Sequence, residues 1–166
     1  KAAIETQNIL NETTKDSQKA YGKAAAEMEL YKEKVETFNG TQEQEKALVD
    51  ELNTKYGDAL GKYKTLEEWK NRLGEAGEAY CKVLMKEAEL TALIDAYQDA
   101  YLQKLEIRQQ YERGDYSKWY RTKAGELKVM RDEQKIVDDR IKSIKDQMKK
   151  VVEEQRAKEV EVIKAE

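Results

Sequence analysis

The chain has 166 residues, of which 31 are basic and 34 acidic, so its formal net charge is −3; it contains no proline, no histidine and one cysteine, Cys81. The absence of proline permits long helices, a charged composition rich in Ala, Leu and Gln is typical of coiled coils, and the absence of histidine removes the commonest general base and metal ligand near neutral pH. The interleaved charges form no basic face for nucleic acid, and no apolar run approaches the ~18 residues that span a membrane, so we expect an all-α structural chain with no enzymatic activity and no catalytic, cofactor-binding or metal-binding residues.

The first predicted helix covers residues 2–38. Its second half carries apolar residues in steps of 3 and 4, the a/d spacing of a heptad: Tyr21, Ala24, Met28, Tyr31, Val35 and Phe38. Continued backwards, this seam reaches the polar residues Ser17 and Thr14. Asn39-Gly40 follows the helix, and both residues tolerate the left-handed conformation that ends helices.

A second, shorter helix is predicted to begin at Thr41. The segment Thr41-Gln42-Glu43-Gln44 has the form of a capping box, and Leu48, Leu52 and Tyr56 lie on one face. We expect Tyr56-Gly57 to end this helix and a brief loop to hold Gly57 and Gly61.

A second capping box, Thr65-Leu66-Glu67-Glu68, predicts a two-turn helix that buries Trp69 and ends near Leu73. Gly74 and Gly77 follow closely. They either end this helix or let a longer helix pass close to a neighbour. Together with the second helix, it would make a small two-helix knob at about 41–73.

The next predicted helix, Glu75–Glu112, has a wide apolar side. Its main stripe consists of Tyr80, Leu84, Ala88, Thr91, Ile94 or Asp95, Gln98, Tyr101 and Leu105. The residues that widen it are Val83, Leu90, Leu93, Tyr97 and Leu102. A stripe of this width suits a helix that packs against more than one partner.

Arg113-Gly114-Asp115 interrupts this pattern, and the last helix is predicted to start at 116–120 and run to the end. Its seam is the longest: Leu127, Met130, Gln134, Val137, Ile141, Ile144, Met148, Val151, Gln155, Lys158 and Val162. The aromatic residues around the break either pack a corner or form a contact surface for another subunit: Tyr111, Tyr116, Trp119 and Tyr120.

These elements predict an elongated antiparallel helical bundle or coiled coil of three long helices with the small knob. The first helix and the Glu75–Glu112 helix would form a hairpin within residues 1–113, and residues 114–166 would be a separate long coiled-coil helix. Seam residues such as Met130 and Ile141 would meet copies of themselves or other helices of the chain. Because Lys1 already reads as helical and no stop signal precedes Glu166, we expect a piece of a larger polypeptide.

Reactive residue types have ordinary structural explanations here. Cys81 is predicted to be a small, buried or half-buried helix residue without a partner for a nucleophile or a zinc site. Glu67-Glu68 fits the favourable charge at a helix N-terminus. Asp138-Asp139 fits a solvated helix face.

The middle of the chain resembles a segment of tail tape measure proteins of tailed bacteriophages and prophages. The residues that carry the resemblance, within about 48–105, are Leu52, Lys55-Tyr56-Gly57, Gly61, Tyr63-Lys64-Thr65, Glu68-Trp69, Leu73, Ala79-Tyr80, Leu84, Glu87-Ala88 and Thr91-Ala92-Leu93. They are packing residues, so no functional residue carries over. The flanking helices match only in being coiled coil.

The resemblance implies a helical rod in the lumen of the virion tail, assembled in the bacterial cytoplasm, whose length sets tail length. It also implies tail tube proteins and tail chaperones as partners. The chain lacks the membrane-inserting and wall-degrading segments that such proteins often carry. The alternative interpretation is a generic coiled-coil scaffold or adaptor that associates with itself or with other coiled-coil chains.

Overall fold

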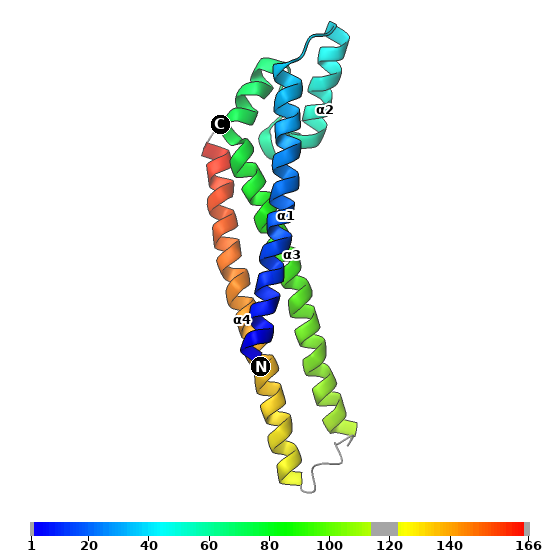
Figure 1. Ribbon diagram of the computed structural model, residues 1–166, viewed down its shortest axis with the longest axis vertical. Helices are drawn as coiled ribbons and strands as arrows, with labels where there is room; N and C mark the ends of the chain where they lie inside the picture. Colours follow the sequence, from blue (N-terminus) through cyan, green and yellow to red (C-terminus); the bar gives the residue numbers. More distant parts are fainter. Residues whose placement is uncertain (1, 114–122, 165–166) are drawn as a thin grey trace. The chain divides into compact units, whose positions relative to one another are not determined.

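The computed structural model describes the backbone of residues 2–113 and 123–164, and the side chains of residue 11, 14–113 and 128–164. These residues form four α-helices and no strand, which confirms the all-α class. The helices, labelled in Figure 1, are α1 (Ala2–Glu36), α2 (Gln42–Leu60), α3 (Leu66–Arg113) and α4 (Lys123–Lys164). The predicted break at Gly114-Asp115 and the aromatic residues Tyr116, Trp119 and Tyr120 lie outside the described residues.

The chain divides into two compact units. Unit 1 comprises Lys1–Lys15 and Glu89–Val151, and unit 2 comprises Asp16–Ala88 and Val152–Glu166. The predicted division at residues 113 and 114 stays a prediction, because residues 114–122, which directly follow it, are not described.

The seam predicted for α1 is confirmed in unit 2. Ala24, Met28, Tyr31 and Val35 are buried, and Ser17 continues the buried line towards the N-terminus. Helix α1 ends at Glu36, near the predicted stop. However, Asn39 and Gly40 do not adopt the predicted left-handed conformation.

Helix α2 has the predicted N-terminus and a different C-terminus. The Gln44 N–H donates to Thr41 Oγ1 at 3.2 Å and the Thr41 N–H donates to Gln44 Oε1 at 2.8 Å, which completes the capping box. The predicted end at Gly57 is wrong: the helix continues for another turn to the buried Leu60, and Gly61, with φ 95°, caps it. A glycine inside a helix costs only about 1 kcal/mol relative to alanine, which burial of a leucine side chain offsets.

The second helix of the predicted knob is not a separate element. Thr65 Oγ1 accepts from the Glu68 N–H at 3.2 Å, but the helix that starts there is α3, which passes through Gly74 and Gly77 to Arg113. A Cβ added at Gly77 would lie 3.1 Å from Met28 Sδ, so this glycine allows α1 and α3 to approach closely. The helix therefore continues through both glycines, and the predicted close approach to a neighbour is observed at Gly77 but not at Gly74, where an added Cβ would meet nothing within 4 Å.

One apolar core holds unit 2 together. Helices α1 and α2 run antiparallel, since Glu27 pairs with Lys55 at 3.0 Å and Lys34 with Glu51 at 3.9 Å. The buried residues come from all four helices: Ala24, Met28, Tyr31, Val35, Val49, Leu52, Tyr56, Leu60, Leu66, Trp69, Leu73, Ala76, Cys81 and Val162. Residues far apart in the sequence thus share one core.

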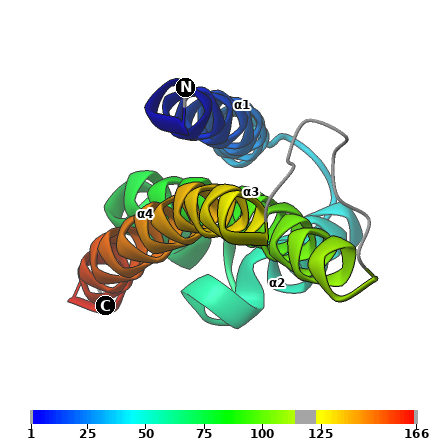
Figure 2. The same ribbon diagram turned by 90° about the horizontal axis from the view of Figure 1, so that it is seen from below.

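Unit 1 contains an antiparallel pairing of α3 with α4, which lie alongside each other in Figures 1 and 2. Lys104 pairs with Asp138 at 2.8 Å, and Arg140 donates to Gln103 at 2.7 Å. The buried residues are Leu93, Ala100, Val137, Ile141, Ile144 and Val151. All four from α4 belong to the predicted seam, which is therefore confirmed here.

The main stripe predicted for α3 is wrong in unit 1. Leu93 and Ala100 are buried, whereas Ile94 is 59% exposed and Tyr101 46% exposed. This part of α3 carries apolar residues on two faces, and α4 packs on the face that contains Leu93. The predicted stripe lies on the other face.

Candidate interaction surface

The turn between α2 and α3 is held by the side chain of Asn53. Its amide Nδ2 donates to the Tyr63 carbonyl at 2.9 Å, and its Oδ1 accepts from the Tyr63 N–H at 2.9 Å and from Trp69 Nε1 at 3.0 Å. The Tyr63 and Trp69 rings meet edge to face with centroids 5.2 Å apart. These hydrogen bonds satisfy polar groups that would otherwise be buried without a partner.

A buried arginine completes this corner. Arg72 Nε donates to the Leu60 carbonyl at 2.8 Å, and its NH2 group donates to the Val162 carbonyl at 3.1 Å. One guanidinium therefore joins the C-terminal turn of α2 to the last turns of α4. A planar fork with five donors suits this task better than a lysine ammonium.

Three tyrosines from α1, α2 and α3 lie in series beside the corner. Tyr56 meets both Tyr31 and Tyr80 edge to face, with centroids 5.6 Å apart in each pair. The hydrogen bond from the Tyr31 hydroxyl to Glu51 Oε1, 2.6 Å long, together with burial, raises the pKa of Tyr31 to about 12. Burial also raises the pKa of Tyr56 and that of Tyr80 above the ordinary value.

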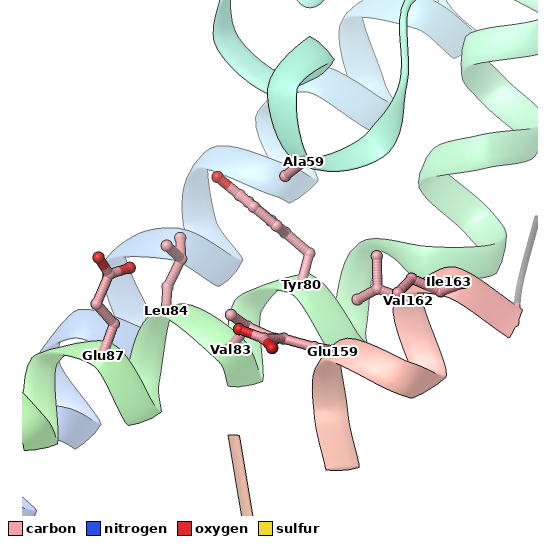
Figure 3. A pocket seen from close by; sticks show the side chains of 8 residues that line it. All are labelled: Ala59, Tyr80, Val83, Leu84, Glu87, Glu159, Val162 and Ile163. Atoms are coloured by element: carbon pink, nitrogen blue, oxygen red, sulfur yellow. The ribbon is translucent and has the colours of Figure 1, made fainter. Parts of the chain in front are cut away.

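A surface groove of about 450 Å³ opens next to Tyr80. We call it the α3–α4 groove, and its lining residues are Ala59, Tyr80, Val83, Leu84, Glu87, Glu159, Val162 and Ile163. Figure 3 shows Tyr80, Val83, Leu84 and Glu87 rising from α3, with Glu159, Val162 and Ile163 facing them from α4. The Tyr80 ring extends towards Ala59 of α2. All of these residues belong to unit 2.

The floor of the α3–α4 groove is apolar and its edge is acidic. Glu87 and Glu159 are both exposed carboxylates. Ile163, at the open end, has 65% of its surface exposed, which is high for an isoleucine. The groove therefore presents an apolar surface that is open to solvent and has two carboxylate side chains among its lining residues.

The reactive residue types lie at ordinary structural positions of the helices. Cys81 is buried as predicted, and burial raises the pKa of its thiol, which disfavours the reactive thiolate. Glu67 and Glu68 occupy the first turn of α3, as predicted. Asp138 and Asp139 lie on an exposed face of α4, as predicted, and Asp138 also forms the ion pair with Lys104 there.

Among the described side chains, those of residue 11 and of residues 14–113 and 128–164, no group of three or more Cys, Asp or Glu is placed to hold a metal ion. Over the same residues, no helix combines the length and apolar character needed to cross a membrane.

The α3–α4 groove was not predicted from the sequence. The available signal was local: Ile163 is apolar but lies outside the heptad seam of α4, one turn after the acidic Glu159. An apolar residue at such a position lines a groove only when α3 supplies the opposite wall of that groove.

Neither the known protein families, nor the curated proteins, nor the solved structures contain a significant match to this chain.

Proposed function

We propose that this chain is a structural helical segment of a tail tape measure protein, which acts in the length control and assembly of a bacteriophage tail rather than in catalysis. The observation that carries the proposal is that the residues of the resemblance form one connected corner. Tyr56, Tyr63 and Trp69 meet there through the Asn53 hydrogen bonds and ring contacts. A shared pattern that encodes a packed unit is stronger support than a shared coiled-coil composition.

The physical basis of a helical ruler is the constant rise of a helix. Each residue adds ~1.5 Å, so a heptad adds about 10 Å. If the chain formed one continuous helical rod, every added heptad would lengthen the tail by about 10 Å. In the antiparallel pairing of α3 with α4, one heptad must be added to each arm to lengthen the pair by about 10 Å.

This difference defines the experiment. The experiment uses the phage or prophage whose genome contains this gene. Residues 97–103 of α3 and residues 139–145 of α4, one heptad each, are duplicated together once, twice and three times. Adding a whole heptad to each arm keeps the apolar seam in register. Averaged tail lengths measured by electron microscopy should rise by about 10 Å per duplicated pair if the antiparallel arms persist, and by about 21 Å if the chain is extended.

The control is an insertion of the same number of Gly and Ser residues between Asn39 and Gly40, outside the helices. It lengthens the chain without lengthening the α3–α4 pair. Tails of constant length across the duplication series would exclude the ruler function. If tail length rose equally with the Gly and Ser insertions and with the duplications, it would depend on the number of residues and not on helical rise.

The second candidate function is a coiled-coil scaffold or adaptor that binds other proteins. The observation that favours it is the α3–α4 groove, a concave surface that a simple ruler does not require. Under this alternative, substitutions in the groove should abolish a protein interaction while tail length stays unchanged. The duplication series and the groove variants therefore separate the two functions.

A further inference from the structure

The solvent side of α4 in unit 1 carries its charges in two straight rows. When the seam residues Val137 and Ile141 are given heptad positions d and a, every b position between 132 and 149 is lysine and every f position is aspartate. The basic row is Lys135, Lys142 and Lys149, and the acidic row is Asp132, Asp139 and Asp146. Both rows repeat every seven residues, so they run alongside each other for about 26 Å on the side of α4 that lies opposite the seam.

The two rows are available to a partner. All six side chains are exposed, and none of them forms an ion pair with another of the residues that the structure describes. The rows are close enough for pairs within the helix, at spacings of three and four residues, but such pairs at exposed positions contribute little and none is formed.

This pattern is complementary to itself when two copies of α4 lie side by side in opposite directions. Two antiparallel helices set the b row of each against the f row of the other, whereas two parallel helices would set each row against its own kind. A two-fold axis midway between residues 140 and 141 places Lys142 of one copy opposite Asp139 of the second copy. The same symmetry pairs the remaining lysines and aspartates: Lys135 with Asp146, and Lys149 with Asp132. Each of these three contacts occurs twice, and all six join opposite charges.

The residues that flank the two rows fit the same arrangement. Ile136, 42% exposed, occupies heptad position c beside the acidic row. In the antiparallel pair it lies opposite Ser143 of the second copy, a small residue that leaves room for it, so apolar area is removed from water. On the other flank Lys145 lies opposite Asp138 of the second copy, so no like charges meet there.

We propose that unit 1 forms an antiparallel dimer with a second copy of this chain, in which the basic row of each α4 lies along the acidic row of the other. A partner of a single charge sign would be repelled by one of the two rows, whereas a second copy meets opposite charge along both. Exposed ion pairs are individually weak and are screened by salt, so this dimer is weak and salt-sensitive. The inference rests on neither proposed function, because it uses only the sequence and the exposure of α4.

Sedimentation velocity of the whole chain measures the dimer. In about 20 mM salt, the mass should rise from 19.3 kDa towards twice that value as the chain concentration is raised to about 1 mM, and about 0.5 M salt should return the chain to the monomer. A chain that stays monomeric at low salt would overturn the proposal. A dimer that persists at high salt would also overturn it.

The decisive variants keep the composition and the net charge of the chain. Asp132→Lys/Lys135→Asp sets like charges against each other at four of the six contacts and should weaken the dimer at least about tenfold. Adding Asp146→Lys/Lys149→Asp makes all six contacts opposite in sign again, and should restore the dissociation constant to within about threefold of its original value. Two parallel copies would not show this rescue, because each row would still meet its own kind.

An equimolar mixture of the two double variants gives a second test of the same pairing, in case the fourfold variant is less helical by circular dichroism. Each double variant meets opposite charge in the other, so the mixture should form a heterodimer although neither variant dimerises alone. Loss of the dimer in both the fourfold variant and the mixture would contradict the antiparallel arrangement.

The matched control is Lys46→Asp/Asp50→Lys, which exchanges the same two charges at exposed positions of α2. It should leave the dissociation constant unchanged, and an effect as large as that of Asp132→Lys/Lys135→Asp would overturn the proposal. The exposed apolar face of α3 is the competing surface. A dimer that Ile94→Ser dissociates and that the exchange of charges on α4 leaves intact would place the contact there instead.

Discussion

Unit 2 surrounds a core in which Leu52, Leu60, Trp69 and Leu73 have no exposed surface, whereas unit 1 depends on six buried apolar residues between α3 and α4. Unit 2 also links its elements through the Asn53 and Arg72 hydrogen bonds. Unit 1 uses exposed or half-exposed pairs such as Lys104 with Asp138, which contribute little in water. Helices of similar regularity can therefore differ widely in stability, because packing between helices supplies most of the stability of a helix in a protein.

The largest expected effect comes from the core of unit 2. Trp69→Ala should lower the free energy of unfolding by about 3–5 kcal/mol through loss of buried area and of the bond to Asn53, and Ile144→Ala in unit 1 by about 2–5 kcal/mol. Hydrogen exchange should show Trp69→Ala deprotecting residues 42–88 and Ile144→Ala deprotecting 89–113 and 128–151. Loss of protection everywhere in both variants would show one cooperative unit and remove the distinction.

A second test addresses the polar corner of unit 2. Asn53→Ala should cost about 2–3 kcal/mol, because the Tyr63 N–H and the Trp69 indole N–H lose their acceptor. The neighbouring Thr54→Ala removes only an exposed bond to the Asp50 carbonyl and should change stability by less than about 0.5 kcal/mol. Chemical denaturation measures both. Similar costs for the two variants would mean that the corner is not what distinguishes unit 2.

A third test uses two tyrosines in the same row. Tyr31→Phe removes the hydrogen bond to Glu51 and should cost about 1 kcal/mol. Tyr56→Phe should be neutral or stabilising by up to about 1 kcal/mol, since the Tyr56 hydroxyl is buried without a hydrogen-bond partner among the described residues. Thermal unfolding at pH 7 gives both signs, and a loss of stability in Tyr56→Phe as large as that in Tyr31→Phe would contradict this description.

The same residue predicts a dependence on pH. The pKa of Tyr31 in the folded chain is raised from 10.0 to about 12. A raised pKa means that the stabilisation is complete below pH 10 and is lost as the pH rises through 12. The stability difference between the native chain and Tyr31→Phe should therefore be constant up to about pH 10 and shrink above it. A difference that stays constant up to pH 12 would refute the hydrogen bond as its cause.

The smallest expected effect is at the two glycines of α3. Gly74→Ala should raise the free energy of unfolding by about 0.5–1 kcal/mol, because a Cβ there meets open space and alanine favours helix. Gly77→Ala should gain less, because its Cβ would lie 3.1 Å from Met28 Sδ. Equal gains would show that α1 and α3 do not need the close approach.

Several features could be read from local residues. The capping box at Thr41 depends on side chains three residues apart, so the sequence is enough to predict it. The seam of α4 was predictable for a similar reason: its apolar residues occupy a single stripe, and a helix with one such stripe has only one side to bury. The same argument applies to the second half of α1.

The sequence misled where two local choices had similar energies. Gly57 and Gly74 are weak stops that a helix passes when burial of a following residue, Leu60 or Ala76, favours continuation. The α3–α4 groove could not be predicted, since its walls are separated by about seventy residues in the chain. It exists only because α4 returns beside α3.

Local sequence is enough to show that the chain is helical, where α2 and α3 begin, and which side of α4 is apolar, because these properties depend on residues within a few turns. Tertiary structure alone decided which face of α3 is buried in unit 1. Leu93 and Ile94 lie on two apolar faces of the same helix, and periodicity gives their angle around its axis without saying where a partner lies. That choice depends on the total area that α3 and α4 bury together, a property of the pair and not of either helix.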